Sequence, residues 1–180
     1  MDGILSPAFM QAACAHKAPE PPVHENVIKL VYTGTTGNAQ KINIAGNGDI
    51  TIFYIENGEP KSMTVTDPHY PVIEIYPDYD EMITIKGNVT DITCYGPPAQ
   101  YISSNVDVSE CDTLSGITVG GPYFKVLKCR ANSQSLVNDI VECFTDEVST
   151  VGTLFTNKDD EYYSELEAAV LARGWTIEEL

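Results

Sequence analysis

Apolar and polar residues alternate with a period of two from Val27 to Ile85, the pattern of half-buried β-strands. The alternation is punctuated by Asn47-Gly48 and Asn57-Gly58, dipeptides that favour two-residue hairpin turns. A further apolar pair, Ile83 and Ile85, closes the series before Gly87. No helical period of useful length interrupts this stretch. We therefore expect about six short strands that form a small antiparallel β-sandwich.

A second regularity begins near residue 83, where one polar residue between two apolar residues recurs at similar intervals. These steps are Ile83-Thr84-Ile85, Ile92-Thr93-Cys94, Val106-Asp107-Val108, Ile117-Thr118-Val119 and Leu127-Lys128-Cys129. Short strands at a near-constant spacing predict the rungs of a solenoid. Because equivalent positions stack in a solenoid, Cys94 and Cys129 are expected to be small, buried side chains.

After Asn132 the apolar period becomes that of α-helices. It predicts a helix over 134–147, which Ser133 or Ser135 can cap. The apolar face of this helix contains Leu136, Val137, Ile140, Val141 and Phe144.

A second helix is predicted over 160–172, after one more short strand at 152–155. Gly174 follows this helix as a C′ residue. Trp175 and Ile177 are then expected to fold back onto the last rung. Two helices at the end of a stack would cover its open apolar edge, which repeat proteins require.

Composition limits the classes of protein to which the chain can belong. The 180 residues contain 43% hydrophobic residues, too many for a mostly disordered chain. With 10 Lys+Arg against 26 Asp+Glu, the net charge is −16, which argues against binding nucleic acid or an anionic membrane surface. No apolar run approaches the roughly 18 to 20 residues of a membrane span.

The negative charge is concentrated near the C-terminus. Residues 139–180 contain 11 acidic residues against only Lys158 and Arg173. Such a surface is usually a solvated face; the alternative is a docking face for a basic partner.

Residues that could carry chemistry are few and scattered. The five cysteines form no C-x-x-C pair, so a structural zinc site is not expected. Asp78, Asp80 and Glu81 could hold a cation, but without an EF-hand spacing they are better explained as a solvated turn. His69 sits between Pro68 and Tyr70, which favours a turn residue. We therefore expect no catalytic residue, no metal and no cofactor.

Residues 1–25 form an expected N-terminal arm, with a stiff proline-rich spacer at residues 19–22. Its apolar side chains would be exposed unless a partner covers them, so they are the expected docking residues. They are Ile4, Leu5, Phe9 and Met10. The alternatives are a frayed terminus and a lipoprotein signal that ends at Cys14.

The C-terminal half resembles leucine-rich-repeat surface proteins of Bacteroides-type bacteria and their phages. Asp107 to Leu114, followed by Ile117-Thr118-Val119, resembles the family's "LDVSxNTALxxLxC" unit. Leu127 to Asn132 resembles the last repeat, and Ala169 to Ile177 resembles the closing "A-x-x-K-G-W-T-V". The resemblance covers about residues 85–178 and implies a short leucine-rich-like array closed by helices.

The N-terminal half is similar, more weakly, to the PKD-like β-domain that often precedes these repeats. The family's acidic-glycine turn, "H-x-Y" step and "YTITITG" strand have counterparts here. These are Phe53 to Gly58, His69-Tyr70 and Met82 to Gly87.

Together, pattern and resemblance predict a mainly β (α+β) protein in three parts. These are an arm (1–25), a PKD-like antiparallel β-sandwich (26–87) and a short leucine-rich-like solenoid capped by two helices (88–180). We expect a non-enzymatic virion structural protein of a Bacteroides-infecting phage, either a head-fibre or capsid-decorating subunit or a tail accessory subunit. Its expected partners are other virion proteins and further copies of itself, with no nucleic acid and no membrane. The alternative is a bacterial surface lipoprotein that binds a protein or a glycan.

Overall fold

The computed structural model describes residues 25–33, 39–94, 103–121, 123–146, 148 and 150–180. Over these residues the chain is mainly β, as predicted, with one mixed ten-stranded sheet and two helices. The elements are β1 (Val27–Tyr32), β2 (Gln40–Glu56), β3 (Glu59–Thr66), β4 (His69–Ile75), β5 (Met82–Thr93), β6 (Ser103–Glu110), β7 (Gly116–Thr118), β8 (Val126–Lys128), α1 (Gln134–Asp146), β9 (Thr153–Thr156), α2 (Tyr163–Ala172) and β10 (Thr176–Glu179).

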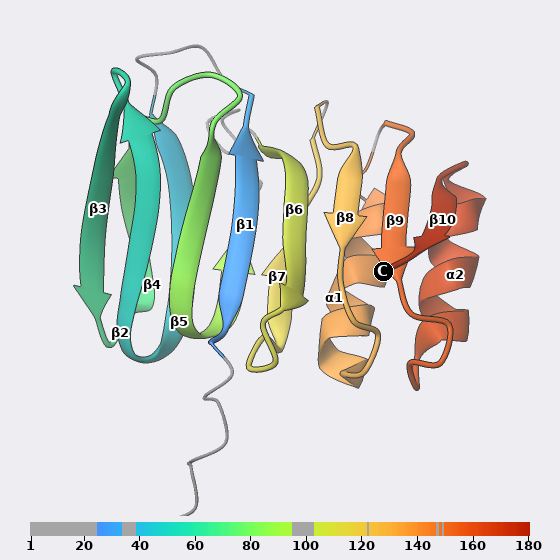
Figure 1. The fold of residues 1–180 in the computed structure, drawn as a ribbon. Coiled ribbons are helices and arrows are strands. Elements are labelled where there is room, and N and C mark those ends of the chain that lie inside the picture. The colour runs from blue at the N-terminus through green and yellow to red at the C-terminus, as the bar shows by residue number, and fades with distance from the viewer. Residues whose placement is uncertain (1–24, 34–38, 95–102, 122, 147, 149) are drawn as a thin grey trace, which may run out of the picture.

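Most strands lie side by side in the order β3-β2-β5-β1-β6-β8-β9-β10, while β4 pairs with β2 and β7 pairs with β5. In Figure 1 this row forms the front layer, and β4, β7 and both helices lie behind it. β1 is central in the row and antiparallel to both β5 and β6. Strands from the predicted domains 26–87 and 88–180 therefore share one sheet, while the division itself stays a prediction.

β2 and β5 are long strands of 17 and 12 residues, and each of them bends part-way along its length. β4 pairs with the first part of β2, residues 40–45, and β3 pairs with the last part, residues 49–56. The pairing of β2 with β5 shifts register at the bend. An added Cβ at Gly46 would lie 2.4 Å from the Asn88 carbonyl oxygen, so only glycine lets the two backbones approach this closely.

The hairpin turn predicted at Asn47-Gly48 is wrong, because β2 runs through both residues. Gly48 has a φ of 73° and lies in an irregular part of the strand. Its N–H donates to Asp67 Oδ1 at 2.7 Å. The turn predicted at Asn57-Gly58 is confirmed. Both residues have positive φ, as a type I′ hairpin requires, and they join β2 to β3.

The last strands of the sheet pair in parallel: β6 with β8, β8 with β9, and β9 with β10. One apolar residue of each strand falls in the same register, and these residues are Val106, Leu127, Leu154 and Ile177. Both predicted helices are confirmed, with ends shifted by a few residues. The Leu136 N–H donates to Ser133 Oγ at 3.4 Å, and Gly174 follows α2 with a φ of 74°.

The buried side chains form one continuous apolar core that runs through both halves of the described chain. Trp175, 2% exposed, packs against the rings of Phe124 and Phe144 near the C-terminal end of this core. Trp175 thus folds back onto the core, while its place on the last rung of a solenoid stays a prediction. The four described cysteines are buried and form no disulfide with one another, and the burial predicted for Cys94 and Cys129 is confirmed. Cys14 lies outside the described residues.

Arg130 and Asp160 form an ion pair that joins the end of β8 to the turn before α2. Arg130 Nη2 lies 2.7 Å from Asp160 Oδ1, and the Ala131 N–H donates to the other carboxylate oxygen at 2.8 Å. Burial by itself disfavours the charged carboxylate, but these hydrogen bonds hold the pKa of Asp160 below its ordinary value.

Replacing Asp160 by asparagine is expected to lower the free energy of unfolding by about 2 kcal/mol at pH 7, because charged hydrogen bonds are lost. Since the pKa of Asp160 is lowered by folding, its contribution is present at neutral pH and disappears as the pH falls below its ordinary value of 3.8. Urea unfolding of the wild type and D160N at pH 7 and pH 3 measures this. A difference that is as large at pH 3 as at pH 7 would contradict the assignment.

Candidate functional site

The docking residues predicted on the arm, Ile4, Leu5, Phe9 and Met10, lie outside the described residues. The described residues begin at Glu25, two residues before the start of β1. Glu25, where the predicted arm ends, also lines the larger of two hollows on the sheet.

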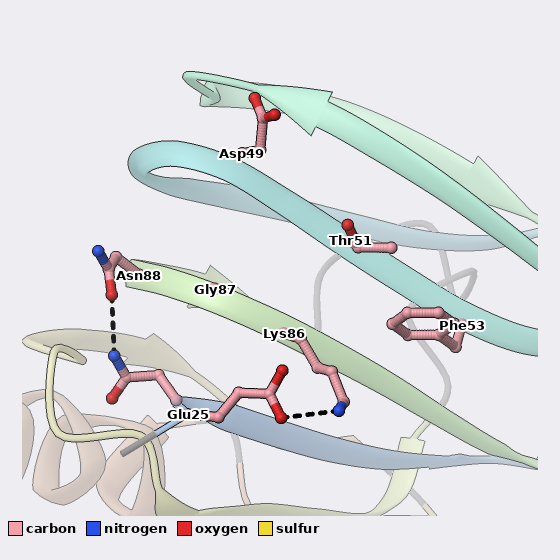
Figure 2. Close-up of a pocket in the computed structure, with 8 residues that line it drawn as sticks. Glu25, Asp49, Thr51, Phe53, Lys86, Gly87 and Asn88 are labelled. Carbon is pink, nitrogen blue, oxygen red and sulfur yellow. Dashed lines mark hydrogen bonds and ion pairs between the residues drawn. The ribbon is translucent and has the colours of Figure 1, made fainter. Parts of the chain in front are cut away.

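The larger hollow opens where β2 and β5 bend, and it has a volume of about 350 Å³. Figure 2 shows three of its lining residues along β2 and three along the neighbouring β5, with Glu25 beside them. The lining residues are Glu25, Asn26, Asp49, Thr51, Phe53, Lys86, Gly87 and Asn88. Two carboxylates, one ammonium group, two amides, one hydroxyl and one aromatic ring therefore surround a single space.

Backbone contacts at the bend give the hollow its shape. Gly87 has a φ of 131°, and an added Cβ there would lie 2.8 Å from the Asp49 carbonyl oxygen. Asn26 holds the start of β1 in place, since its carbonyl accepts from the Gly87 N–H at 3.1 Å and its side-chain oxygen accepts from the Asp112 N–H at 3.0 Å. The wall of the hollow is therefore built from three separate parts of the chain.

The polar side chains around the hollow are partly engaged with one another. Lys86 Nζ lies 2.8 Å from Glu25 Oε2, and Asn26 Nδ2 donates to Asn88 Oδ1 at 2.9 Å (Figure 2). Both groups of the Lys86–Glu25 pair are well exposed, so the pair orients the ammonium group more than it stabilises the fold. Phe53, which also lines the hollow, is 40% exposed and pairs with Thr84 of β5.

A smaller hollow of about 130 Å³ lies on the same sheet, over β1, β6 and β8. Its lining includes Lys29, Met82, Asp107 and Lys128. A row of neighbouring positions connects the two regions across the sheet, and it consists of Phe53, Thr84, Lys29, Asp107, Lys128 and Phe155. The Lys128 ammonium lies 5.2 Å from the centre of the Phe155 ring.

Acidic residues singled out in the sequence have structural contacts. Both carboxylate oxygens of Asp78 accept backbone N–H groups of the hairpin turn, from Asn57 at 2.9 Å and from Gly58 at 2.7 Å. On α1, Asp139 accepts the Ile117 N–H of β7 at 3.1 Å. Among the residues that the structure describes, no three His, Cys, Asp or Glu side chains are grouped to hold a metal ion.

Burial also determines the chemistry of the cysteines. Loss of solvent raises the pKa of Cys129 to about 12 and raises the pKa of Cys94 further. Burial likewise raises the pKa of Cys111. These side chains are therefore protonated at neutral pH and pack in the core as small groups.

Sequence reasoning missed the hollow, although it singled out some residues near it. The alternation of residues along 49–53 predicts a strand, and Gly87 follows the apolar pair that closes the predicted series; neither pattern indicates a hollow.

Neither helix of the described residues is long and apolar enough to cross a membrane. Comparison with protein families, with curated proteins and with solved structures finds no match to this chain.

Proposed function

We propose that this chain is a non-enzymatic virion structural subunit that docks through its N-terminal arm and oligomerises on the particle. In this proposal Ile4, Leu5, Phe9 and Met10 insert into a partner, while the sheet and the acidic C-terminal part project outward. The role is that of a head-fibre or capsid-decorating subunit, or a tail accessory subunit, as the family resemblance implies.

The observation that carries the proposal is the place where the arm joins the sheet. The arm leads into β1, the central strand, which is hydrogen-bonded to β5 on one side and β6 on the other. A force that pulls the arm along β1 would therefore act in shear on two ladders of backbone hydrogen bonds, one with β5 and one with β6. The hydrogen bonds of Asn26 with Asn88, Gly87 and Asp112 hold the junction itself.

We also propose the finer architecture: an antiparallel β-sandwich followed by a short leucine-rich-like solenoid. The bends of β2 and β5 support the sandwich, because each strand pairs with different neighbours before and after its bend. The parallel ladder with Val106, Leu127, Leu154 and Ile177 in register supports the solenoid. The buried Trp175 supports a family-like closing segment.

A non-enzymatic role is supported by what the reactive side chains do. The carboxylate of Asp78 holds a turn, that of Asp139 holds a strand, and the buried cysteines remain protonated. These groups serve the fold, and their contacts explain why those residue types are present.

Deleting residues 1–22 is expected to abolish incorporation into particles, because the apolar docking residues are removed while the sheet is left intact. Full-length and truncated protein supplied in trans to an infected host, followed by quantification of copies per purified particle, measures this. A matched variant keeps the arm's length but carries Ile4→Ser, Leu5→Ser, Phe9→Ser and Met10→Ser. Circular dichroism reports whether each variant folds. Incorporation at the wild-type level by either folded variant would contradict the anchor.

A further inference from the structure

The geometry points to the larger hollow, at the bend of β2 and β5, as a binding site for a neutral sugar residue of a glycan. This inference does not depend on the proposed assembly role. It follows from which chemical groups surround the hollow and from its size.

The polar groups around the hollow match a ligand that both donates and accepts hydrogen bonds. The Asp49 carboxylate can accept, and the Lys86 ammonium, which donates to Glu25 at 2.8 Å, keeps further N–H groups to donate. The Thr51 hydroxyl shares a hydrogen bond with Thr64 Oγ1 at 3.1 Å and has one more donor or acceptor position for a ligand. The Asn88 side chain uses its oxygen to accept from Asn26. Sugar hydroxyls are both donors and acceptors, so one ring can satisfy such a mixed set, whereas a pure donor or a pure acceptor cannot.

Phe53 adds an apolar platform beside these polar groups. It pairs with Thr84 on β5, while its strand neighbour Thr51 pairs with Lys86, so all four face the same side of the sheet. The electron-rich face of an aromatic ring attracts polarised C–H groups, such as those on one face of a pyranose. A ligand with hydroxyls at its rim and C–H groups on its face fits this combination.

Charge and polarity argue against two other classes of ligand, anions and wholly apolar molecules. Two carboxylates face one ammonium group, and the whole chain carries −16, so phosphates and polyanions are repelled. A wholly apolar ligand would cover the Asp49 carboxylate without giving it a hydrogen bond, at a cost of several kcal/mol. A volume of about 350 Å³ lies within the roughly 300 to 1,000 Å³ typical of small-molecule sites.

The rest of the face fits a chain of sugars better than a single one. The second hollow opens on the same sheet and also combines donors with acceptors, since its lining includes Lys29, Lys128, Asn105 and Asp107. Between the two regions the surface is an uninterrupted row of strand positions. We therefore assign the larger hollow as the primary subsite of an extended glycan.

Titration of the full-length protein with defined neutral gluco-, xylo-, manno- and galacto-oligosaccharides, followed by ¹⁵N–¹H NMR, tests the assignment. At least one series is expected to shift the resonances of residues 49–53 and 86–88. Phe53→Ala is expected to weaken that binding about tenfold, because the aromatic platform is lost. Asp49→Asn is expected to weaken it several-fold, because a charged acceptor is replaced by a neutral one.

Tyr76→Ala is the matched control, since Tyr76 is 43% exposed against 40% for Phe53 and does not line the hollow. Its affinity should equal that of the wild type, and thermal unfolding of each variant shows that the fold is kept. Sialylated or sulfated oligosaccharides should bind more weakly than their neutral counterparts. The inference is overturned if none of the neutral series shifts these resonances, if Phe53→Ala binds as the wild type does, or if anionic sugars are preferred.

Discussion

Replacing Trp175 by alanine is expected to lower the free energy of unfolding by about 4 kcal/mol, the range for removing a buried aromatic side chain. The Trp175 ring lies 5.2 Å from the Phe124 ring and 4.9 Å from the Phe144 ring, between centroids. Its Nε1–H also donates to the Thr150 carbonyl at 2.6 Å. Alanine would leave a cavity and an unpaired carbonyl at the C-terminal end of the core. Urea unfolding followed by far-UV circular dichroism measures the loss.

Two companion variants separate packing from the hydrogen bond. Trp175→Phe keeps an aromatic ring but removes the donor, so it should cost about half as much as alanine. Leu171→Ala changes a side chain that is 53% exposed on α2, so it should cost under about 0.5 kcal/mol. A loss at Trp175→Ala no larger than that at Leu171→Ala would show that the closing segment does not stabilise the fold.

Replacing Gly46 by alanine is expected to cost about 3 kcal/mol, at the upper end of the range for overpacking. The added Cβ would lie 2.4 Å from the Asn88 carbonyl oxygen and 2.6 Å from Ile50 Cδ1. The first of these is backbone, so relief requires β2 and β5 to move apart at their bend. Because the larger hollow lies at this bend, its lining residues should also show altered NMR shifts. Equilibrium unfolding in urea measures the stability.

Gly48 provides the control two residues away on the same strand. An added Cβ there meets nothing within 4 Å, but the residue has a φ of 73°. Gly48→Ala is therefore expected to cost only the strain of a left-handed alanine, about 1 kcal/mol. Equal losses at Gly46 and Gly48 would mean that backbone conformation, and not close approach of the strands, explains the glycine at position 46.

The candidate hollow could not be predicted from the sequence, although most of the strands and both helices could. Its walls come from residues 25–26, 49–53 and 86–88, which meet only because β2 and β5 bend together. Asn47-Gly48 is as well suited to a hairpin turn as to an irregular strand position. The choice depends on Asp67, which accepts the Gly48 N–H, and on pairing with β5 some forty residues later.

The acidic residues illustrate the same limit. In the sequence Asp78 belongs to an acidic loop and Asp139 to an acidic helix face, patterns that usually indicate a solvated surface. In the structure each accepts backbone N–H groups from a distant segment, Asp78 from the turn at 57–58 and Asp139 from β7. A carboxylate's local sequence does not reveal which backbone groups the fold leaves without a partner.

By itself the sequence determined the mainly β character, the two helices with their caps, and the burial of the described cysteines. Those features follow from local periodicity, because a period of 2 or 3.6 records which side of an element is withdrawn from water. Only the tertiary structure decided that Asn47-Gly48 continues a strand, that the bends create a polar hollow, and that β1 lies at the centre of one shared sheet. Those features depend on strand pairing between distant segments, whose free energy comes from the whole core and is not encoded in any one stretch of the chain.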